Sequence, residues 1–115
     1  MATQRQQSSN VPPTVRAAIA ENFDGDAQLY QAFAAACAAQ FAQDVSIGQA
    51  GCDVGDLPAL RRLAHNLKSA LTMLGHDDLF AVAQSLESQA AAGDLLSAEA
   101  SWRVLRTELS RWQST

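Results

Sequence analysis

Apolar side chains recur at steps of three and four residues along most of this chain. The spacing is most regular between Asp56 and Gly75, where the apolar residues are Leu60, Leu63, Ala64, Leu67, Leu71 and Leu74. Such steps place side chains on one face of an α-helix, so we expect this segment to bury that face and to expose the opposite one. The same spacing appears in other segments, which indicates several amphipathic helices packed together.

The composition favours a helical fold over a β fold. The chain has 115 residues, about the length of one small domain, and it is 48% hydrophobic but only 6% aromatic. Alanine and leucine dominate and β-branched residues are few, as in helices that pack through small side chains. The sequence therefore predicts an all-α protein.

Capping residues and glycines divide the chain into five expected helices. Asp26 and Asp56 suit N-cap positions, and Gly75 suits the end of a helix. The expected ranges are Pro13 to about Asn22, Ala27 to about Gln49, Leu57 to Leu74, Asp77 to near Gly93, and about Ser97 to Gln113. In the second range the expected apolar stripe is Leu29, Phe33, Ala36, Cys37, Phe41 and Val45, and Gly48 and Gly51 weaken its end. This pattern predicts an antiparallel up-down four-helix bundle with a short additional N-terminal helix.

The first residues differ from the rest of the chain. Residues 1–10 are rich in Gln, Ser and Thr and have little to bury, so they are expected to form a disordered N-terminal tail. Residues 11–115 are expected to form the helical domain. No secretory leader pattern is visible, no apolar stretch is long enough to span a bilayer, and the two cysteines lack metal-ligand or redox spacing. We therefore expect a cytoplasmic protein with no membrane partner.

Charge is unevenly distributed on this acidic chain, whose formal net charge is −4. The segments 17–60 and 69–102 contain acids but no Lys or Arg, whereas Arg61, Arg62 and Lys68 lie within about two helical turns of one another. A net acidic charge disfavours nucleic acid as a partner. A local group of cations on an acidic protein instead indicates a small anionic target.

His65 lies inside this cationic segment. At about 100° per residue it falls roughly 160° from Leu67, the centre of the expected buried face, with Ser69 and Thr72 beside it. A neutral imidazole in solvent is a nucleophile near physiological pH, and Lys68, one turn away, can neutralise the oxygens of a phosphoryl group. His76, beside Asp77 and Asp78, is expected to have a capping or surface role.

The segment Ala64-His65-Asn66-Leu67-Lys68-Ser69-Ala70, followed by Leu74-Gly75, resembles the A-H-x-[LI]-K-G-[SA]…[LV]-G signature of histidine-containing phosphotransfer (HPt) domains of bacterial phosphorelays. The order of helices and helix-capping pairs also resembles the layout of that family, over about Val11 to Gln113. One position departs from the signature, because Ser69 stands where the family usually has glycine.

The resemblance implies a role for each residue that matches the motif. His65 would accept a phosphoryl group on Nε2 from the aspartyl phosphate of a receiver domain and pass it to another receiver. Lys68 would neutralise phosphate charge, and Glu87, or less favourably Gln84, would orient the imidazole. The expected partner-binding residues are Arg61, Arg62, Ser69 and Thr72.

The same resemblance predicts a phosphocarrier with a phosphohistidine intermediate and no autonomous kinase activity. The chain has no glycine-rich nucleotide loop, and no acids cluster round His65 to hold a metal. No cofactor is therefore expected on this chain, and Mg²⁺ is expected on the partner receiver domain. That partner is expected to be the receiver of a response regulator, which could belong to a hybrid sensor histidine kinase, and the chain is expected to be a monomer.

Two other functions remain open at this point. The dimerisation and phosphoacceptor domain of a histidine kinase has an H-E-[LI]-[RK]-x-P box, which His65-Asn66-Leu67-Lys68-Ser69-Ala70 matches loosely; Asn66 replaces its acid and Ala70 its proline. The second alternative is a non-catalytic helical interaction module.

Overall fold

The computed structural model describes residues 12–114, with the side chains of 12–112, and within that range it contains only helices and turns. The helices are α2 (Pro13–Asn22), α3 (Ala27–Asp53), α4 (Leu57–Leu74), α5 (Asp77–Ala91) and α6 (Leu95–Ser114). The predicted all-α fold class and the short N-terminal helix are confirmed. The tail predicted for residues 1–10 and the start of the domain at residue 11 lie outside the described residues.

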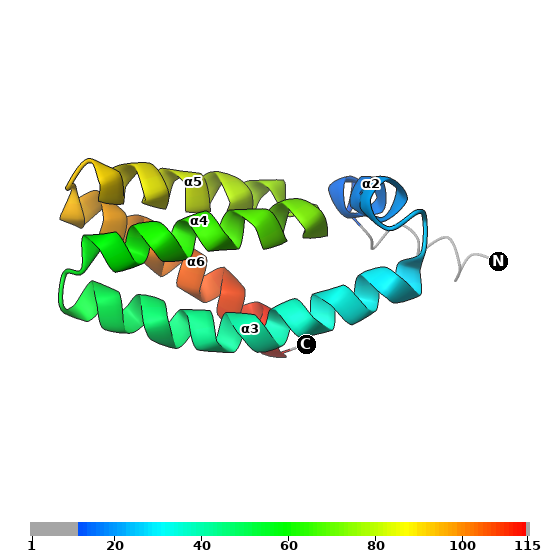
Figure 1. Cartoon of the computed structure of the whole chain (residues 1–115), viewed down its shortest axis with the longest axis horizontal. Helices are drawn as coiled ribbons and strands as arrows, with labels where there is room; N and C mark the ends of the chain where they lie inside the picture. The colour runs from blue at the N-terminus through cyan, green and yellow to red at the C-terminus, as the bar shows by residue number, and fades with distance from the viewer. Residues whose placement is uncertain (1–11, 115) are drawn as a thin grey trace.

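The four long helices pack as an antiparallel bundle (Figure 1), with α4 against α5, α5 against α6, and α3 against both α4 and α6. The helix α3 is the longest and extends past the end of α4, and α2 covers this extension. The contact of α2 with the end of α4 is close, because Asn22 Nδ2 donates to the Met73 carbonyl at 3.3 Å. The short helix therefore closes one end of the bundle.

Aspartate caps fix the starts of three helices. The side chains of Asp26, Asp56 and Asp94 accept backbone N–H bonds from Leu29 at 3.0 Å, Ala59 at 3.1 Å and Ser97 at 3.2 Å. The first two caps are confirmed as predicted. The expected start of the last helix at about Ser97 was wrong by two residues, because α6 begins at Leu95. Ser97 lies inside its first turn, where its backbone N–H donates to the capping side chain of Asp94.

The predicted end of the second helix at Gln49 was also wrong, since α3 continues to Asp53. A Cβ added at Gly48 would overlap the indole of Trp102, and one at Gly51 would lie 3.6 Å from Ala59 Cβ. Gly48 therefore allows α6 to approach α3 closely, and that packing outweighs its low helix propensity, whereas a Cβ at Gly51 would make only an ordinary van der Waals contact with α4.

The core lies along the axis of the bundle and is filled mainly by leucine and one tryptophan. The predicted apolar face of α4 is confirmed: Leu60, Leu63, Ala64, Leu67, Leu71 and Leu74 are all buried. On α3 the predicted stripe was wrong at Leu29, which is 53% exposed, and at Ala36, which is also exposed. Near its start the helix instead buries Tyr30, whose hydroxyl donates to the Leu74 carbonyl at 2.9 Å, while Cys37 and Phe41 are buried as predicted.

Candidate functional site

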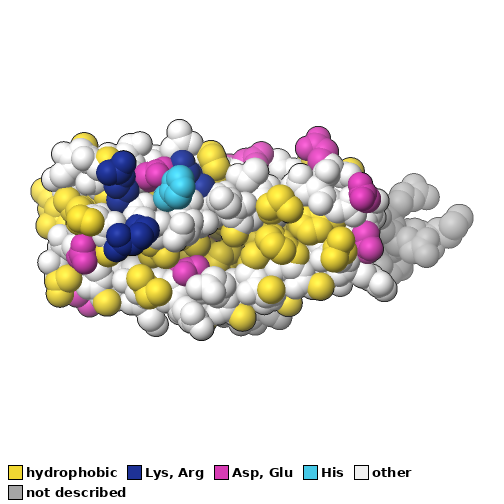
Figure 2. All heavy atoms as spheres, viewed as in Figure 1, with side chains coloured by type: hydrophobic (Ala, Val, Ile, Leu, Met, Phe, Trp, Pro, Cys, Tyr) yellow, Lys and Arg dark blue, Asp and Glu magenta, His cyan; other side chains and the backbone are white. Residues whose placement is uncertain are grey.

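His65 lies on the outer face of α4, opposite the leucines that α4 buries. Its side chain is 69% exposed, which confirms the orientation predicted from the helical spacing. Figure 2 shows Lys and Arg side chains gathered round a histidine on this face, with an acidic side chain beside it and other acidic side chains spread over both ends of the molecule. The imidazole is therefore accessible to another molecule, and the cations Arg61, Arg62 and Lys68 line the same surface.

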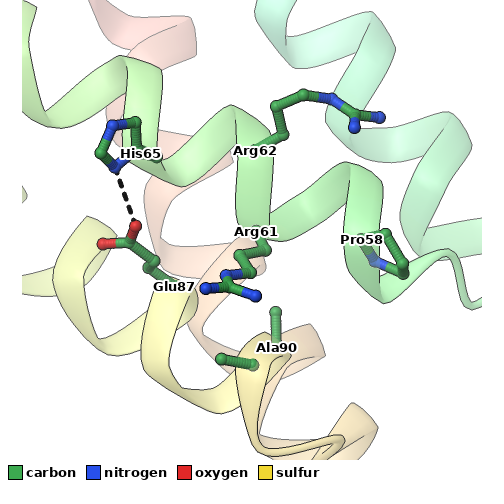
Figure 3. A pocket seen from close by; sticks show the side chains of 7 residues that line it. Pro58, Arg61, Arg62, His65, Glu87 and Ala90 are labelled. Atoms are coloured by element: carbon green, nitrogen blue, oxygen red, sulfur yellow. Dashed lines mark hydrogen bonds and ion pairs between the residues drawn. The ribbon is translucent and has the colours of Figure 1, made fainter.

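The α4–α5 hairpin brings Glu87 to His65. Gly75, with φ +79°, reverses the chain between the two antiparallel helices, and His65 and Glu87 lie eleven residues before and after His76. Equal separation from the turn places them side by side, because both helices rise by the same length per residue. Nδ1 of His65 lies 2.9 Å from Oε2 of Glu87 (Figure 3).

The other carboxylate oxygen of Glu87 binds Lys68. Its Oε1 lies 2.6 Å from Lys68 Nζ, and the ammonium also lies 5.8 Å from the centre of the Phe80 ring. Both partners of the ion pair are about four-fifths buried. The hydrogen bond from Lys68 and, with less effect, that from His65 lower the pKa of Glu87 below its usual value, so its carboxylate is ionised at neutral pH.

This arrangement assigns the tautomer of His65. An ionised carboxylate only accepts hydrogen bonds, so Nδ1 must carry the proton that it donates to Glu87. Nε2 of the neutral ring then holds the free lone pair. The site therefore presents a nucleophilic nitrogen to solvent on a ring whose other nitrogen is held.

Two shallow grooves meet at His65. The residues of the first are Pro58, Arg61, Arg62, His65, Glu87, Ala90 and Ala91. Those of the second are His65, Lys68, Ser69, Thr72, Met73 and Phe80. The structure thus brings together His65, Lys68, Glu87 and the four residues expected to bind a partner.

Sequence reasoning missed several members of these grooves, above all Phe80 and Met73. Phe80 could have been found by counting residues outward from the turn at Gly75, because residues at similar distances from the turn lie side by side on α4 and α5. Gln84, the weaker candidate for orienting the ring, lies instead in a separate groove with Ala81, Ser85 and Ser88.

The second histidine lies away from this site. His76 occupies the N-cap position of α5, although its side chain makes no capping hydrogen bond, and it is half-buried against Trp112 with ring centroids 4.7 Å apart. Burial lowers the pKa of His76, and the nearby Asp77 and Asp78 oppose that effect only in part. It is therefore a packing residue where two helices meet.

Two further observations concern residues 12–114. This part of the chain has no group of three or more His, Cys, Asp or Glu side chains placed to hold a metal ion. Its helices are too short or too polar to cross a membrane.

Comparison with known protein families gives one match. The family model described as the Hpt domain matches residues 27–115. No curated protein and no solved structure matches the chain. The matched range contains α3 to α6 and therefore all the residues that meet around His65.

Proposed function

The chain belongs to the Hpt domain family, which carries out histidine phosphotransfer in two-component phosphorelays, and we propose that His65 is its phosphoacceptor. In this proposal, His65 takes a phosphoryl group from the aspartyl phosphate of one receiver domain and passes it to another. The observation that carries the proposal is the state of the ring: Nδ1 is bound by Glu87, while Nε2 lies on an exposed side chain.

The chemistry is an in-line displacement at phosphorus. The lone pair of Nε2 forms the N–P bond as the bond from phosphorus to the aspartyl oxygen breaks, and that oxygen leaves as carboxylate. In the reverse direction the same bonds exchange roles. The chain acts as a carrier rather than a classical enzyme, and we propose that it has no kinase activity of its own.

Charge neutralisation supports the transfer. Lys68, one turn from His65, would compensate part of the charge on the phosphoryl oxygens, and Mg²⁺ in the acidic pocket of the receiver would compensate most of it. In this scheme Arg61 and Arg62 on one side of His65, and Ser69 and Thr72 on the other, contact the receiver. The hydroxymethyl group of Ser69 is exposed in its groove, so it leaves space for a partner.

We propose that the chain acts as a monomer in the cytoplasm, with response-regulator receivers, including those of hybrid sensor kinases, as partners. One chain supplies all four long helices of the bundle, whereas the dimerisation domain of a histidine kinase is a hairpin that needs a second copy. Sedimentation equilibrium at micromolar concentration tests this part: we expect a mass of about one chain, and an obligate dimer would favour the kinase domain.

The decisive experiment offers the protein a phosphorylated receiver and follows acid-labile, base-stable label. Wild-type protein should take up label, His65→Gln should take up none, and His76→Gln, the matched control at the other histidine, should behave as wild type. If several candidate receivers fail to label the wild-type protein, the carrier function is wrong and an interaction module is favoured. If His65→Gln still takes up label, the site is wrong.

A further inference from the structure

The two oxygens of Glu87 bind two different groups, and this geometry suggests a role beyond fixing the tautomer of the ring. Oε2 lies 2.9 Å from His65 Nδ1 and Oε1 lies 2.6 Å from Lys68 Nζ. We propose that Glu87 keeps Nδ1 protonated after His65 is phosphorylated, an inference that rests on the proposed function. Glu87 would thereby hold the ring of phosphohistidine as an imidazolium, the form that gives up its phosphoryl group most readily.

The argument begins with the proton balance of the transfer. Neutral His65 already carries its proton on Nδ1 when Nε2 attacks, so the first product is an imidazolium with phosphorus on Nε2 and a proton on Nδ1. When this ring later donates the phosphoryl group, the electrons of the N–P bond return to Nε2 and the neutral imidazole is restored. If Nδ1 loses its proton in between, the leaving group becomes an imidazolate anion, which is a much poorer one.

The anionic phosphoryl group on Nε2 itself favours the protonated ring, and the charged side chains around the ring add to this effect or oppose it. Among the described residues, those that share the two grooves with His65 are Arg61, Arg62 and Lys68 on α4 and Glu87 on α5. The three cations favour loss of the Nδ1 proton, because each repels an imidazolium. Glu87 is the carboxylate that opposes them, and it makes direct contact with the proton concerned.

The carboxylate of Glu87 is itself held in place. Lys68 binds its second oxygen, and the ammonium of Lys68 in turn lies over the Phe80 ring. In the unphosphorylated site the carboxylate is therefore ionised and oriented toward Nδ1. Phe80 and Lys68 act in this scheme as positioning groups for Glu87 and do not touch the proton themselves.

A titration of phosphorylated protein tests the proposal. Wild type and Glu87→Gln are phosphorylated with phosphoramidate, and the ¹⁵N and ³¹P resonances of phosphohistidine are followed against pH. Gln keeps the shape of Glu and one acceptor oxygen but removes the charge. We expect the apparent pKa of Nδ1 to fall by about one unit in Glu87→Gln, at the low end of the effect of a neighbouring opposite charge, because His65 is exposed.

A matched control separates this local effect from a change in net charge. Glu108→Gln removes one acid from α6, where Glu108 pairs with Arg111, and should leave the titration of phosphohistidine unchanged. A shift below about 0.3 unit in Glu87→Gln, or an equal shift in Glu108→Gln, would overturn the proposal.

A transfer assay supplies the functional measure. The rate of transfer from phosphohistidine to a receiver should fall with rising pH about one unit earlier in Glu87→Gln than in wild type. Identical pH profiles would contradict the role of Glu87 while leaving the phosphocarrier function intact. If no phosphohistidine forms at His65 in wild type, both the function and this inference fail.

Discussion

At His65, a single side chain combines accessibility with a fixed orientation. The ring is exposed because α4 buries its opposite face, and it is oriented because Glu87 accepts from Nδ1. Lys68 contributes in a different way, since its ammonium is bound to Glu87 before any phosphoryl group arrives. In the unphosphorylated site, the cation expected to neutralise phosphate is therefore already present and paired with Glu87.

Removal of the Lys68 charge should slow phosphoryl transfer. In Lys68→Gln we expect the rate of transfer from a phosphorylated receiver to His65 to fall by about 10- to 100-fold, because the phosphoryl oxygens lose a cation and the Glu87 carboxylate loses its partner. Rapid-quench labelling measures this rate. Arg103→Gln, at an exposed cation on α6, is the control and should retain the wild-type rate.

His76 should make the stability of the protein depend on pH. Burial lowers its pKa in the folded protein below the value of about 6.5 in the unfolded chain. As the pH falls below 6.5, the unfolded chain therefore gains the proton first, and the folded state loses stability until the pH passes the lower, folded pKa.

Urea unfolding of wild type and His76→Phe at several pH values between 7.5 and 5 tests this effect. Phe keeps an aromatic ring beside Trp112 but cannot titrate, so the variant should lose less stability than wild type over that range. If the free energy of unfolding changes with pH equally in the two proteins, titratable groups other than His76 account for the pH dependence of stability.

At the level of the elements, the α4–α5 hairpin builds the site. Gly75 reverses the chain in a left-handed conformation, and α2 packs directly against it: a Cβ there would lie 2.5 Å from the Thr14 carbonyl oxygen and 2.8 Å from Ala18 Cβ. The turn that sets the register of His65 and Glu87 is thus also the contact that holds α2. Local conformation and packing both require glycine at this position.

A pair of glycine substitutions separates these two requirements. Gly93, between α5 and α6, has φ +76° and nothing within 4 Å of an added Cβ, so Gly93→Ala tests backbone strain alone. We expect Gly93→Ala to lower the free energy of unfolding by about 1 kcal/mol and Gly75→Ala by about 3 kcal/mol, because only the latter displaces α2. Chemical denaturation measures both, and equal losses would mean that α2 adapts without cost.

At the scale of the whole molecule, bundle closure and charge distribution act together. The closure of α3 on α6 depends on Gly48 lying against Trp102, which is fully buried. The resulting surface carries the cations Arg61, Arg62 and Lys68 beside His65. Such a field favours approach of an anionic partner at one face.

Neutralising the cations of the first groove should weaken docking of the receiver. In the double variant Arg61→Ala with Arg62→Ala, we expect kcat/KM for transfer to fall about tenfold at low salt and its dependence on salt to decrease. The control removes two cations from α6, Arg103→Ala with Arg111→Ala, and keeps the same net charge as the test variant. If kcat/KM falls equally in the two double variants, the net charge of the protein, and not the position of Arg61 and Arg62, determines docking.

The sequence alone predicted much of this structure, and its errors are specific. The apolar spacing of α4 correctly placed His65 outside and Leu67 inside, and two aspartate caps were correctly located. The stripe of α3 failed at Leu29 because nearly continuous apolar residues leave the buried face ambiguous, and in the structure Tyr30, bound to the Leu74 carbonyl, is buried in its place. Gly48 was assigned to a weakening helix end because its partner Trp102 is distant in the chain.

Local pattern therefore determined which segments are helical, which face of α4 is buried, and that His65 is exposed among cations. The family resemblance already named Glu87 as the partner of His65; tertiary structure alone decided that its other oxygen binds Lys68, that Gln84 lies in another groove, and that Phe80 faces the lysine. The physical reason is that periodicity fixes the direction of a side chain about the axis of its own helix. The rotation and register of one helix against another depend instead on packing between residues far apart in the chain.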